Sequence, residues 1–309
     1  GPELKAKHGL ASYQKLGISD RDGEIQFGGR SLAVSRLVSI MKMMGHAGRR
    51  IDVLKMDVDG SEWQAIPDIF GSGIDIGQLL LKVHIPQTWH GQELLMRLRK
   101  LFKVIEDRGF QIFHVGFNFA CNYTCAEFAF VNRRLYPAER AALAQSSAMK
   151  KPTPGETSAM LTATRDQRQK IWDLVESACA GGRTAYCSFD SWKAWYLWPK
   201  ETSCKGVLGE WRDYSEVRMG SLELNSAKWL CNPHALASLS PRCLVYSFGG
   251  QHEYDWDVAM LEATGCEHHI FDPSSVCESK GSNCTAYADM HGPELKAKHG
   301  LASYQKLGI

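Results

Sequence analysis

The two ends of the chain carry the same sequence. Residues 1–18 read GPELKAKHGLASYQKLGI, and residues 292–309 repeat these letters without a change. An identity of this length is not the degenerate similarity of a solenoid repeat. The chain either spans a window of tandem copies of one unit, or it comes from a message whose end joins its beginning. In both cases we expect the natural start of the folding unit to lie inside the chain.

The natural start of the folding unit is predicted to lie at residues 134–160, RLYPAERAALAQSSAMKKPTPGETSAM. This segment is rich in Ala, Ser, Thr and Pro, so it cannot bury enough apolar surface to offset its ordering entropy. We therefore interpret it as a linker. A surface helix over residues 137–148 is an equal alternative for its first half, whereas Lys150–Thr157 is expected to be a loop in either case.

Length and charge exclude some partners. A chain of 309 residues can hold one large domain or two small ones, with ample material for a core. Its net charge of +2 gives no case for nucleic-acid binding, which usually needs a strong basic patch. No apolar run reaches the roughly 18 residues that span a bilayer, so no membrane span is expected in this chain. The oligomeric state is not indicated.

The cysteines bear on the cellular compartment. All ten lie after Ala120, and two glycosylation sequons, at Asn122 and Asn283, lie beside cysteines. An even cysteine count with glycosylation acceptors favours a secretory lumen. Sequons also arise by chance and buried free cysteines are common, so the cytoplasm stays the alternative.

Two groups of residues resemble metal ligands. Cys121 and Cys125 have the spacing of one half of a zinc site, but no second suitably spaced pair accompanies them. Cys266, His268 and His269 lie close in sequence, yet a β-strand would send them to opposite faces. Packing of a strand is therefore favoured, and no metal is expected.

Apolar runs and helical periods alternate along the chain as a parallel sheet requires. Strands are predicted at Ile51–Val58, Ile76–Ile85, Cys243–Phe248 and Glu267–Phe271, and helices at Ser61–Ile66, Gln92–Asp107, Ala163–Ala180 and Trp256–Thr264. The helix that begins at Ser61 is expected to end at Pro67. Two further strands, Phe110–Gly116 and Cys125–Val131, leave no room for a helix between them and should form an antiparallel edge hairpin. The aromatic-rich stretch Tyr186–Trp229 is expected to be irregular.

A glycine turn and an acidic residue follow two of these strands. The turn SFGGQ spans Ser247–Gln251, and Asp272 ends the next strand. Glycine lets backbone N–H groups approach a ligand, and an acid at the second strand tip can accept hydrogen bonds from ribose hydroxyls. The alternative is an ordinary turn with an exposed aspartate. Because the G-x-G-x-x-G spacing is missing, a nicotinamide-dependent oxidoreductase is disfavoured.

The segment KMDVDGSEW, Lys55–Trp63, lies at the carboxyl end of another predicted strand. Ligands of open α/β sheets bind outside such ends. Asp57, Asp59 and Glu62 fall within six positions, but strand alternation and the start of a helix predict that they cannot all point inward. One of them is expected to be a cap or solvated, and Ser61 is expected to cap the helix.

A histidine ends the strand that follows. His84 could act as a general base near neutral pH. The alternative is a hydrogen-bonded structural histidine, which is the commoner outcome for a single histidine.

Taken in the order CLVYSFGG, GCEHHIFDPSS, KLGISDRDGEI, IDVLKMDVDGSEWQAI and IGQLLLKVHI, these segments resemble the FkbM-type methyltransferases, above all their eukaryotic methyltransferase-like branch. In that branch too a segment like AKWLCNP, here Ala227–Pro233, precedes the first strand. This sequence departs from the family by order, because the family's first two strands lie near the carboxyl end. The resemblance implies a Rossmann-like class I methyltransferase fold with a mostly parallel sheet and an antiparallel edge hairpin, circularly permuted.

The resemblance also implies a division of the chain. Residues 1–133 would form the second half of the methyltransferase domain, 134–160 the linker, 161–240 a helical and aromatic-rich extension, 241–291 the first, cofactor-binding half, and 292–309 a duplicate of 1–18. The two copies would compete for one strand position. The amino-terminal copy is predicted to fill it, because it continues directly into Ser19 and Asp20.

The implied cofactor is S-adenosylmethionine. Its expected contacts are Ser247, Phe248, Gly249 and Gly250 for the methionine part, Asp272 for the ribose, Ile18, Ser19 and Asp20 near the adenine, and Asp57 facing the donor or acceptor. His84 or Asp57 is predicted to remove the acceptor's proton. An O-directed transfer to a small molecule or glycan is the leading interpretation. A catalytically inert Rossmann-like binding module, with Trp192–Trp198 as a glycan-binding stretch, is the alternative.

Overall fold

A computed structural model describes residues 11–86, 88–89, 91–117, 125–135, 170, 173, 204, 216–219, 228–236, 238, 243–249 and 255–273. Several sequence-based expectations lie outside these residues. They are the linker beyond Leu135, most of the helix at Ala163–Ala180, the three tryptophans between 192 and 198, Gly250, and the second copy at 292–309.

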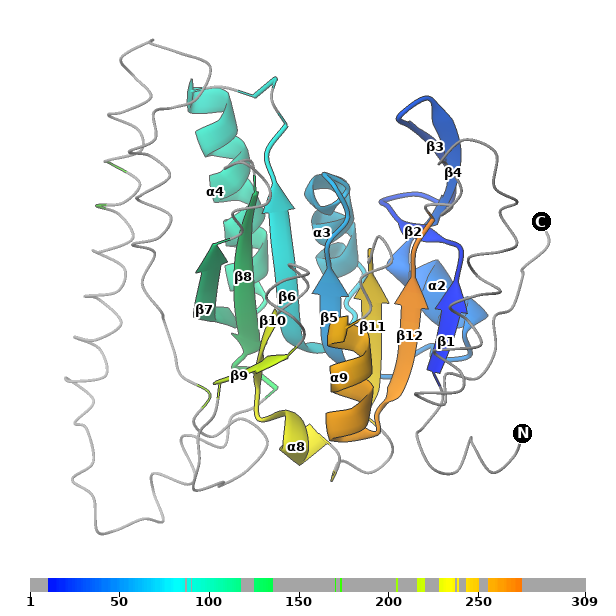
Figure 1. Ribbon diagram of the computed structural model, residues 1–309. Coiled ribbons are helices and arrows are strands. Elements are labelled where there is room, and N and C mark those ends of the chain that lie inside the picture. Colours follow the sequence, from blue (N-terminus) through cyan, green and yellow to red (C-terminus); the bar gives the residue numbers. More distant parts are fainter. Residues whose placement is uncertain are drawn as a thin grey trace.

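A seven-stranded mixed sheet forms the centre of the described part (Figure 1). Its order is β1 (Ala11–Gln14), β12 (Glu267–Phe271), β11 (Leu244–Phe248), β5 (Ile51–Met56), β6 (Ile76–His84), β8 (Cys125–Asn132) and β7 (Phe110–Phe117). The neighbours from β1 to β6 pair parallel, whereas β8 pairs antiparallel with both β6 and β7. The antiparallel hairpin expected from the sequence is therefore present at one edge.

Helices cover both faces of the sheet, in the three-layer arrangement of a Rossmann-like fold. One face carries α2 (Leu37–Met43), α3 (Glu62–Gly71) and α4 (Gly91–Asp107), and the other carries α8 (Pro233–Leu236) and α9 (Asp255–Thr264) (Figure 1). Strand alternation divides the core accordingly. On β11, for example, Tyr246 and Phe248 join the cluster under α2, α3 and α4, while Val245 joins the cluster under α8 and α9.

Two small sheets complete the described structure. β2 (Gly17–Ile18), β4 (Arg30–Ser35) and β3 (Gly23–Phe27) form one of them, and β9 (Glu216–Met219) pairs antiparallel with β10 (Lys228–Cys231) in the other. The second sheet lies in a stretch that the sequence analysis took as irregular. Its strands form because Met219 and Leu230 are buried in the core on the α9 side.

Helix α3 is longer than the sequence predicted. It continues through Pro67 to Gly71, although proline removes one intrahelical hydrogen bond and costs about 3 kcal/mol inside a helix. Ile69 and Phe70 lie beyond the proline and are buried in the core. Each fully buried side chain of this kind contributes about 1.5–3 kcal/mol, so packing of the second half outweighs the local penalty.

Disulfides tie the sheet to its surroundings. Cys243 and Cys266 join the amino ends of β11 and β12, and Cys204 joins Cys231 at the end of β10. Cys125 is also disulfide-bonded. Because Cys266 is in a disulfide, it cannot complete a metal site with the two histidines that follow it. Among the described helices, none is long and apolar enough to cross a membrane.

The amino-terminal copy of the repeated sequence occupies the edge of the sheet. Its residues Ala11–Gln14 form β1 and pair in register with His268 to Phe271 of β12. This arrangement agrees with the expectation that the amino-terminal copy fills the strand position.

Candidate functional site

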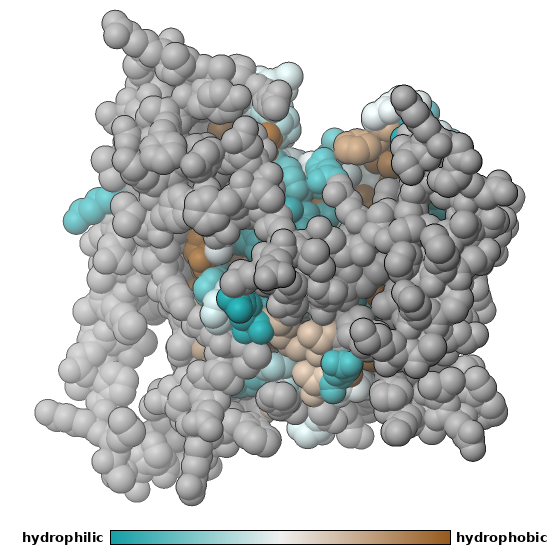
Figure 2. All heavy atoms as spheres, in the orientation of Figure 1, coloured by the Kyte–Doolittle hydropathy of each residue, from teal (hydrophilic) through white to brown (hydrophobic). Residues whose placement is uncertain are grey.

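A pocket opens at the carboxyl ends of β11, β12 and β5. It is lined by Gly17, Ile18, Ile25, Phe27, Leu32, Val34, Asp57, Val58, Asp59, Ser61, Phe248, Gly249, Phe271, Asp272 and Pro273. Figure 2 shows this upper edge of the molecule hollowed between brown side chains on the side of the β3–β4 hairpin and teal side chains at the centre. The position agrees with the rule that open α/β sheets bind ligands outside the carboxyl ends of their strands.

Gly249 brings two strand ends into close contact at this pocket. It has a positive φ of 74°, and its N–H donates to the carbonyl of Phe271 at 2.9 Å. A Cβ at this position would lie 1.7 Å from the backbone oxygen of Asp57. Only glycine fits here, because any side chain would push β11 away from the chain that follows β5.

The pocket wall combines carboxylates with apolar side chains. Asp57, Asp59 and Asp272 contribute carboxylates, and the β3–β4 hairpin supplies Ile25 and Phe27 together with other apolar side chains. A ligand that fits this wall combines a polar part with a flat apolar part.

The structure separates the predicted cofactor residues into two groups. Phe248, Gly249, Asp272 and Asp57 line the pocket, whereas Ser247, Ser19 and Asp20 are not among the lining residues. Ser247 is fully buried under the pocket, where its hydroxyl accepts a hydrogen bond from the Lys55 ammonium at 3.1 Å. Ser19 is also buried and its hydroxyl donates to Asp20 at 3.1 Å.

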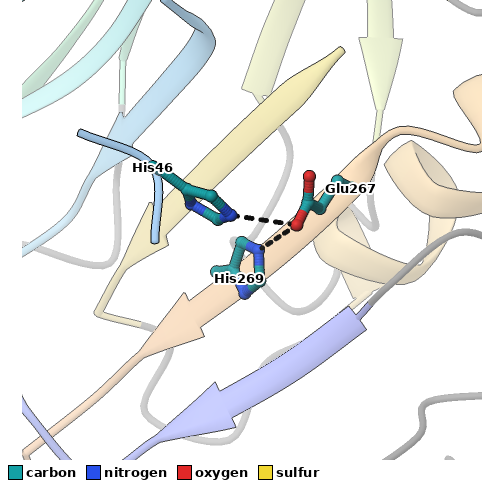
Figure 3. A group of neighbouring side chains, drawn as sticks. All are labelled: His46, Glu267 and His269. Carbon is teal, nitrogen blue, oxygen red and sulfur yellow. Dashed lines mark hydrogen bonds and ion pairs between the residues drawn. The ribbon is translucent and has the colours of Figure 1, made fainter. Parts of the chain in front are cut away.

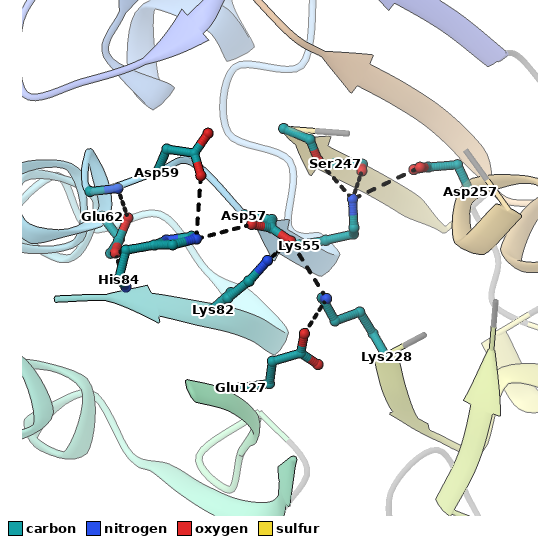
Figure 4. Close-up of polar contacts among 12 residues, drawn as sticks. Lys55, Asp57, Asp59, Glu62, Lys82, His84, Glu127, Lys228, Ser247 and Asp257 are labelled. Carbon is teal, nitrogen blue, oxygen red and sulfur yellow. Dashed lines mark hydrogen bonds and ion pairs between the residues drawn. The ribbon is translucent and has the colours of Figure 1, made fainter. Parts of the chain in front are cut away.

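His84 lies where three carboxylates converge (Figure 4). Its Nε2 is 3.5 Å from Asp57 Oδ1 and 3.4 Å from Asp59 Oδ1, and its Nδ1 is 3.3 Å from Glu62 Oε1. The sequence predicted that the three acids could not all point inward and that one of them would be a cap or solvated. This is confirmed, because the side chain of Asp59 is 41% exposed, although its Oδ1 still reaches Nε2 of His84. The chain turns back because Asp59 has a φ of 48° and Gly60 a φ of 105°, so that strand alternation no longer applies after β5.

Glu62 is the most buried of these acids and holds the imidazole in place. Its side chain has no solvent exposure. Its Oε2 accepts the N–H of Gly60 at 2.9 Å, and its Oε1 accepts the backbone N–H of His84. Ser61, expected to cap α3, makes no capping hydrogen bond with its side chain. Glu62 does not replace this cap, because the N–H that it accepts belongs to Gly60, in the turn before the helix. Burial alone would lower the pKa of His84, but the hydrogen bond and charge of Glu62 and the charge of Asp57 raise it.

Lysines surround Asp57 on the side away from His84 (Figure 4). Lys82 Nζ lies 3.2 Å and Lys228 Nζ 3.6 Å from Asp57 Oδ2. Burial would raise the pKa of Asp57, but the charges of Lys228, Lys82 and other nearby cations lower it. Lys228 also contacts Glu127 at 2.8 Å, and although burial would lower the pKa of Lys228, the two carboxylates raise it. Asp57 is therefore ionised.

Lys55 and Asp257 form a second buried pair beneath the pocket. Lys55 Nζ donates to the carbonyl oxygen of Gly249 at 2.9 Å and lies 3.9 Å from Asp257 Oδ2. Asp257 in turn contacts His268 Nε2 at 2.9 Å. Burial would raise the pKa of Asp257, but Lys55 and His268 lower it. The pair fixes the turn after β11 from below.

A further cluster lies at the opposite end of β12 (Figure 3). Glu267 Oε1 is 3.0 Å from His46 Nε2 and 3.3 Å from His269 Nε2. The other ring nitrogens contact the hydroxyls of Tyr246 at 2.7 Å and Ser12 at 2.6 Å. Each imidazole can thus donate to the carboxylate and accept from a hydroxyl. The cluster is fully paired and ties β1 and β12 together.

Comparison with known proteins identifies a family and relatives of this chain. The family described as "Methyltransferase domain" matches residues 5–132 and 193–302. The chain is similar to the probable methyltransferase-like protein 24 of Homo sapiens, with 30% identity over 128 residues, and to that of Rattus norvegicus, with 28% identity over 128 residues. In both cases the match covers 37% of this chain and 34% of the relative, so the chain spans about a third of the length of these relatives. No solved structure matches the chain significantly. Because the family covers most of the sequence, including every element that lines the pocket, the chain belongs to the methyltransferase-domain family.

Proposed function

We propose that the chain is an S-adenosylmethionine-dependent methyltransferase that transfers the methyl group to a hydroxyl of a small molecule or glycan. The observation that carries this proposal is the mixed lining of the pocket at the carboxyl ends of β11, β12 and β5, where carboxylates stand beside apolar side chains. An adenosyl group has a flat apolar ring and a polar ribose, which suit such a lining.

The residues of the pocket fit this cofactor as follows. Asp272, at the tip of β12, would accept hydrogen bonds from the ribose hydroxyls. Ile18 and the apolar side chains of the β3–β4 hairpin would cover the adenine. The backbone of Phe248 and Gly249 would face the methionine part. The bound cofactor supplies an electrophilic methyl group on a sulfonium, so that much of the catalysis can come from orientation of the two reactants.

The acceptor side is assigned to His84 and Asp57. With Nδ1–H donated to Glu62, the imidazole presents Nε2 toward the pocket side, where Asp57 and Asp59 lie. A general base in this position removes the hydroxyl proton as the oxygen–carbon bond forms, and such a group contributes about 10²- to 10⁴-fold to the rate.

We further propose that the family's strands are present in circularly permuted order. The sheet order supports this, because β11, β12 and β1 are neighbours although β1 comes first and β11 and β12 come last in the chain. Read from β11 through β12 and then from β1 to β8, the strands follow the order of the segments that resemble FkbM-type methyltransferases.

An oxidising compartment such as the secretory lumen is proposed as the setting. Disulfides support it, among them Cys204–Cys231 and Cys243–Cys266 in the described part of the chain, because structural disulfides persist in oxidising environments.

Calorimetric titration with S-adenosylmethionine and S-adenosylhomocysteine tests the cofactor. We expect micromolar binding that Asp272→Ala weakens about 10- to 150-fold, since a hydrogen bond to a charged group contributes about 1.5–3 kcal/mol. The matched control is Asp107→Asn, which removes an exposed carboxylate paired with Lys103 on α4. Unchanged affinity in Asp272→Ala, or an equal loss in both variants, would contradict the assignment.

A second measurement separates the enzyme from an inert binding module. For a hydroxyl acceptor identified by screening, His84→Ala should lower kcat by about 10²- to 10⁴-fold and leave cofactor affinity nearly unchanged. Cofactor binding without turnover on any acceptor would favour the inert module instead.

A further inference from the structure

We propose that Asp57, Asp59 and His84 bind one divalent transition-metal ion of the Mn²⁺ class at the acceptor end of the pocket. No metal was expected from the sequence, because neither the cysteine pairs nor the residues around Cys266 form a suitable ligand set. The site inferred here uses two carboxylates and one imidazole, a donor set that suits Mn²⁺ and similar ions.

The distances between the three donor atoms support an ion between them. Nε2 of His84 lies 3.5 Å from Asp57 Oδ1 and 3.4 Å from Asp59 Oδ1, and the three donor atoms all lie within 4.8 Å of one another. A normal N–H···O hydrogen bond is about 2.7–3.2 Å long, so both contacts are long for direct bonds. Two ligands held at about 2.1 Å from one ion are about 3.0 Å apart at the right angle of an octahedral ion such as Mn²⁺ and about 3.4 Å apart at a tetrahedral angle. A movement of about 0.4–0.5 Å would therefore bring each carboxylate and the imidazole to an octahedral ion.

Glu62 supplies the outer partner that a metal-bound histidine usually has. It is buried, and its Oε1 faces Nδ1 of His84 at 3.3 Å. A carboxylate in this place keeps the proton on Nδ1, turns the ring and leaves the lone pair of Nε2 for the ion. Asp57 and Asp59 face that nitrogen, and Asp59 is partly exposed, with 41% of its side chain accessible, so an ion can enter from the pocket.

The local charges also favour a cation. Three carboxylates, those of Asp57, Asp59 and Glu62, contact the imidazole of His84. Their negative charges attract a cation to this place. The two lysines beside Asp57 approach its Oδ2, and therefore Oδ1 stays on the side of His84 and the ion.

This inference rests on the proposed function for the role of the ion. It replaces the general-base role of His84 in the metal-bound protein, because Nε2 cannot bind the ion and accept the acceptor's proton at once. In the metal-bound protein the acceptor's hydroxyl oxygen would bind the ion, which lowers the pKa of that hydroxyl. The O–H bond then breaks with the proton passing to water, the oxygen–methyl bond forms, and the sulfur–methyl bond breaks with its electron pair staying on sulfur.

Mn²⁺ is the appropriate probe, because it prefers oxygen and nitrogen ligands over thiolates and so discriminates against free cysteines. Untagged full-length chain is titrated with Mn²⁺ alone, with free Mn²⁺ followed by electron paramagnetic resonance. We expect one ion per chain and at least a tenfold weaker affinity in Asp59→Asn. Asparagine tolerates the left-handed backbone at this position, so Asp59→Asn should keep the turn, and circular dichroism checks that it folds.

The control is again Asp107→Asn, which should bind Mn²⁺ as the unaltered chain does. No binding by the folded chain, or binding that Asp59→Asn leaves unchanged, would overturn the inference. Because no cofactor or acceptor is present, these outcomes are independent of the cofactor titration. Cofactor binding without Mn²⁺ binding refutes the metal site alone, and Mn²⁺ binding without cofactor binding refutes the proposed function alone.

Discussion

Replacing Gly249 by alanine tests how the pocket is built. The new methyl group would lie 1.7 Å from the carbonyl oxygen of Asp57, and real Cβ contacts essentially never fall below 3.0 Å. The strand ends must therefore separate by at least 1.3 Å, the difference between these two distances. Two hydrogen bonds hold Gly249 and its neighbours in place. The N–H of Asp57 donates to Phe248 between β5 and β11, and the N–H of Gly249 donates to Phe271 between β11 and β12, both at 2.9 Å.

The expected cost follows from these contacts. A left-handed conformation costs alanine about 1–2 kcal/mol relative to glycine. Loss of the two backbone hydrogen bonds adds about 1 kcal/mol each. Gly249→Ala should therefore lower the free energy of unfolding by about 3–4 kcal/mol, and it should abolish cofactor binding because the pocket floor is displaced.

Gly265→Ala is the matched control. Gly265 also has a positive φ, 61°, but no atom lies within 4 Å of the position of its missing Cβ. Only the conformational cost of about 1–2 kcal/mol should remain. Urea unfolding without reductant, followed by tryptophan fluorescence, gives both values. Equal losses in the two variants would refute the steric reasoning and leave backbone conformation as the sole cause.

Three further changes test other parts of the structure. Deletion of residues 292–309 should change the free energy of urea unfolding by less than about 0.5 kcal/mol, as for changes outside the core, and a loss above about 1 kcal/mol would show that this copy fills the strand position. Replacing both Cys243 and Cys266 by serine should lower the free energy of unfolding by about 3 kcal/mol, because the disulfide closes a loop with a sequence separation of 23 and so restricts the unfolded chain. Urea unfolding of this variant and of the unaltered chain, both without reductant, gives the difference. Glu267→Gln should cost about 1.5–3 kcal/mol at pH 7. Hydrogen bonds from His269 and His46 depress the pKa of Glu267, so its contribution is present above the pKa of the unfolded chain, about 4.3, and is lost as the pH falls. Unfolding curves of the two proteins should thus converge in acid, and a constant gap down to pH 2 would contradict the pairing.

Sequence patterns predicted the main strands and the residues at their carboxyl ends, because both depend on local order. A buried strand needs a continuous apolar run, and parallel strands bring their ends to one edge. Gly249, Asp272 and Asp57 therefore meet as expected at one pocket. The prediction that α3 ends at Pro67 was wrong. Burial of the residues that follow the proline outweighs its unfavourable helix propensity.

The convergence around His84 could not be predicted in the same way. It depends on backbone angles at Asp59 and Gly60, which a strand pattern does not contain. Lys82 and Lys228 were missed as well, although a signal was present. Each lies within a short apolar strand, in LLLKVH and in KWLC, and a lysine in such a place is buried only when it has an acidic partner. Lys228 and Asp57 are far apart in sequence, so only the folded chain shows that they are partners.

The repeated sequence raises the question of why one copy rather than the other should form the edge strand. Residues 302–305 read ASYQ, as β1 does, and 30 residues separate them from the end of β12. Such a length suffices for the crossover that links parallel neighbours, so distance alone does not exclude the second copy. The first copy is tied to the pocket by the residues that follow it. Beyond Ile18 the chain runs into Ser19, whose N–H donates to Ser35 at 3.0 Å, and then into the β3–β4 hairpin that covers the pocket. The copy that forms the edge strand therefore also anchors the apolar side chains that line the pocket.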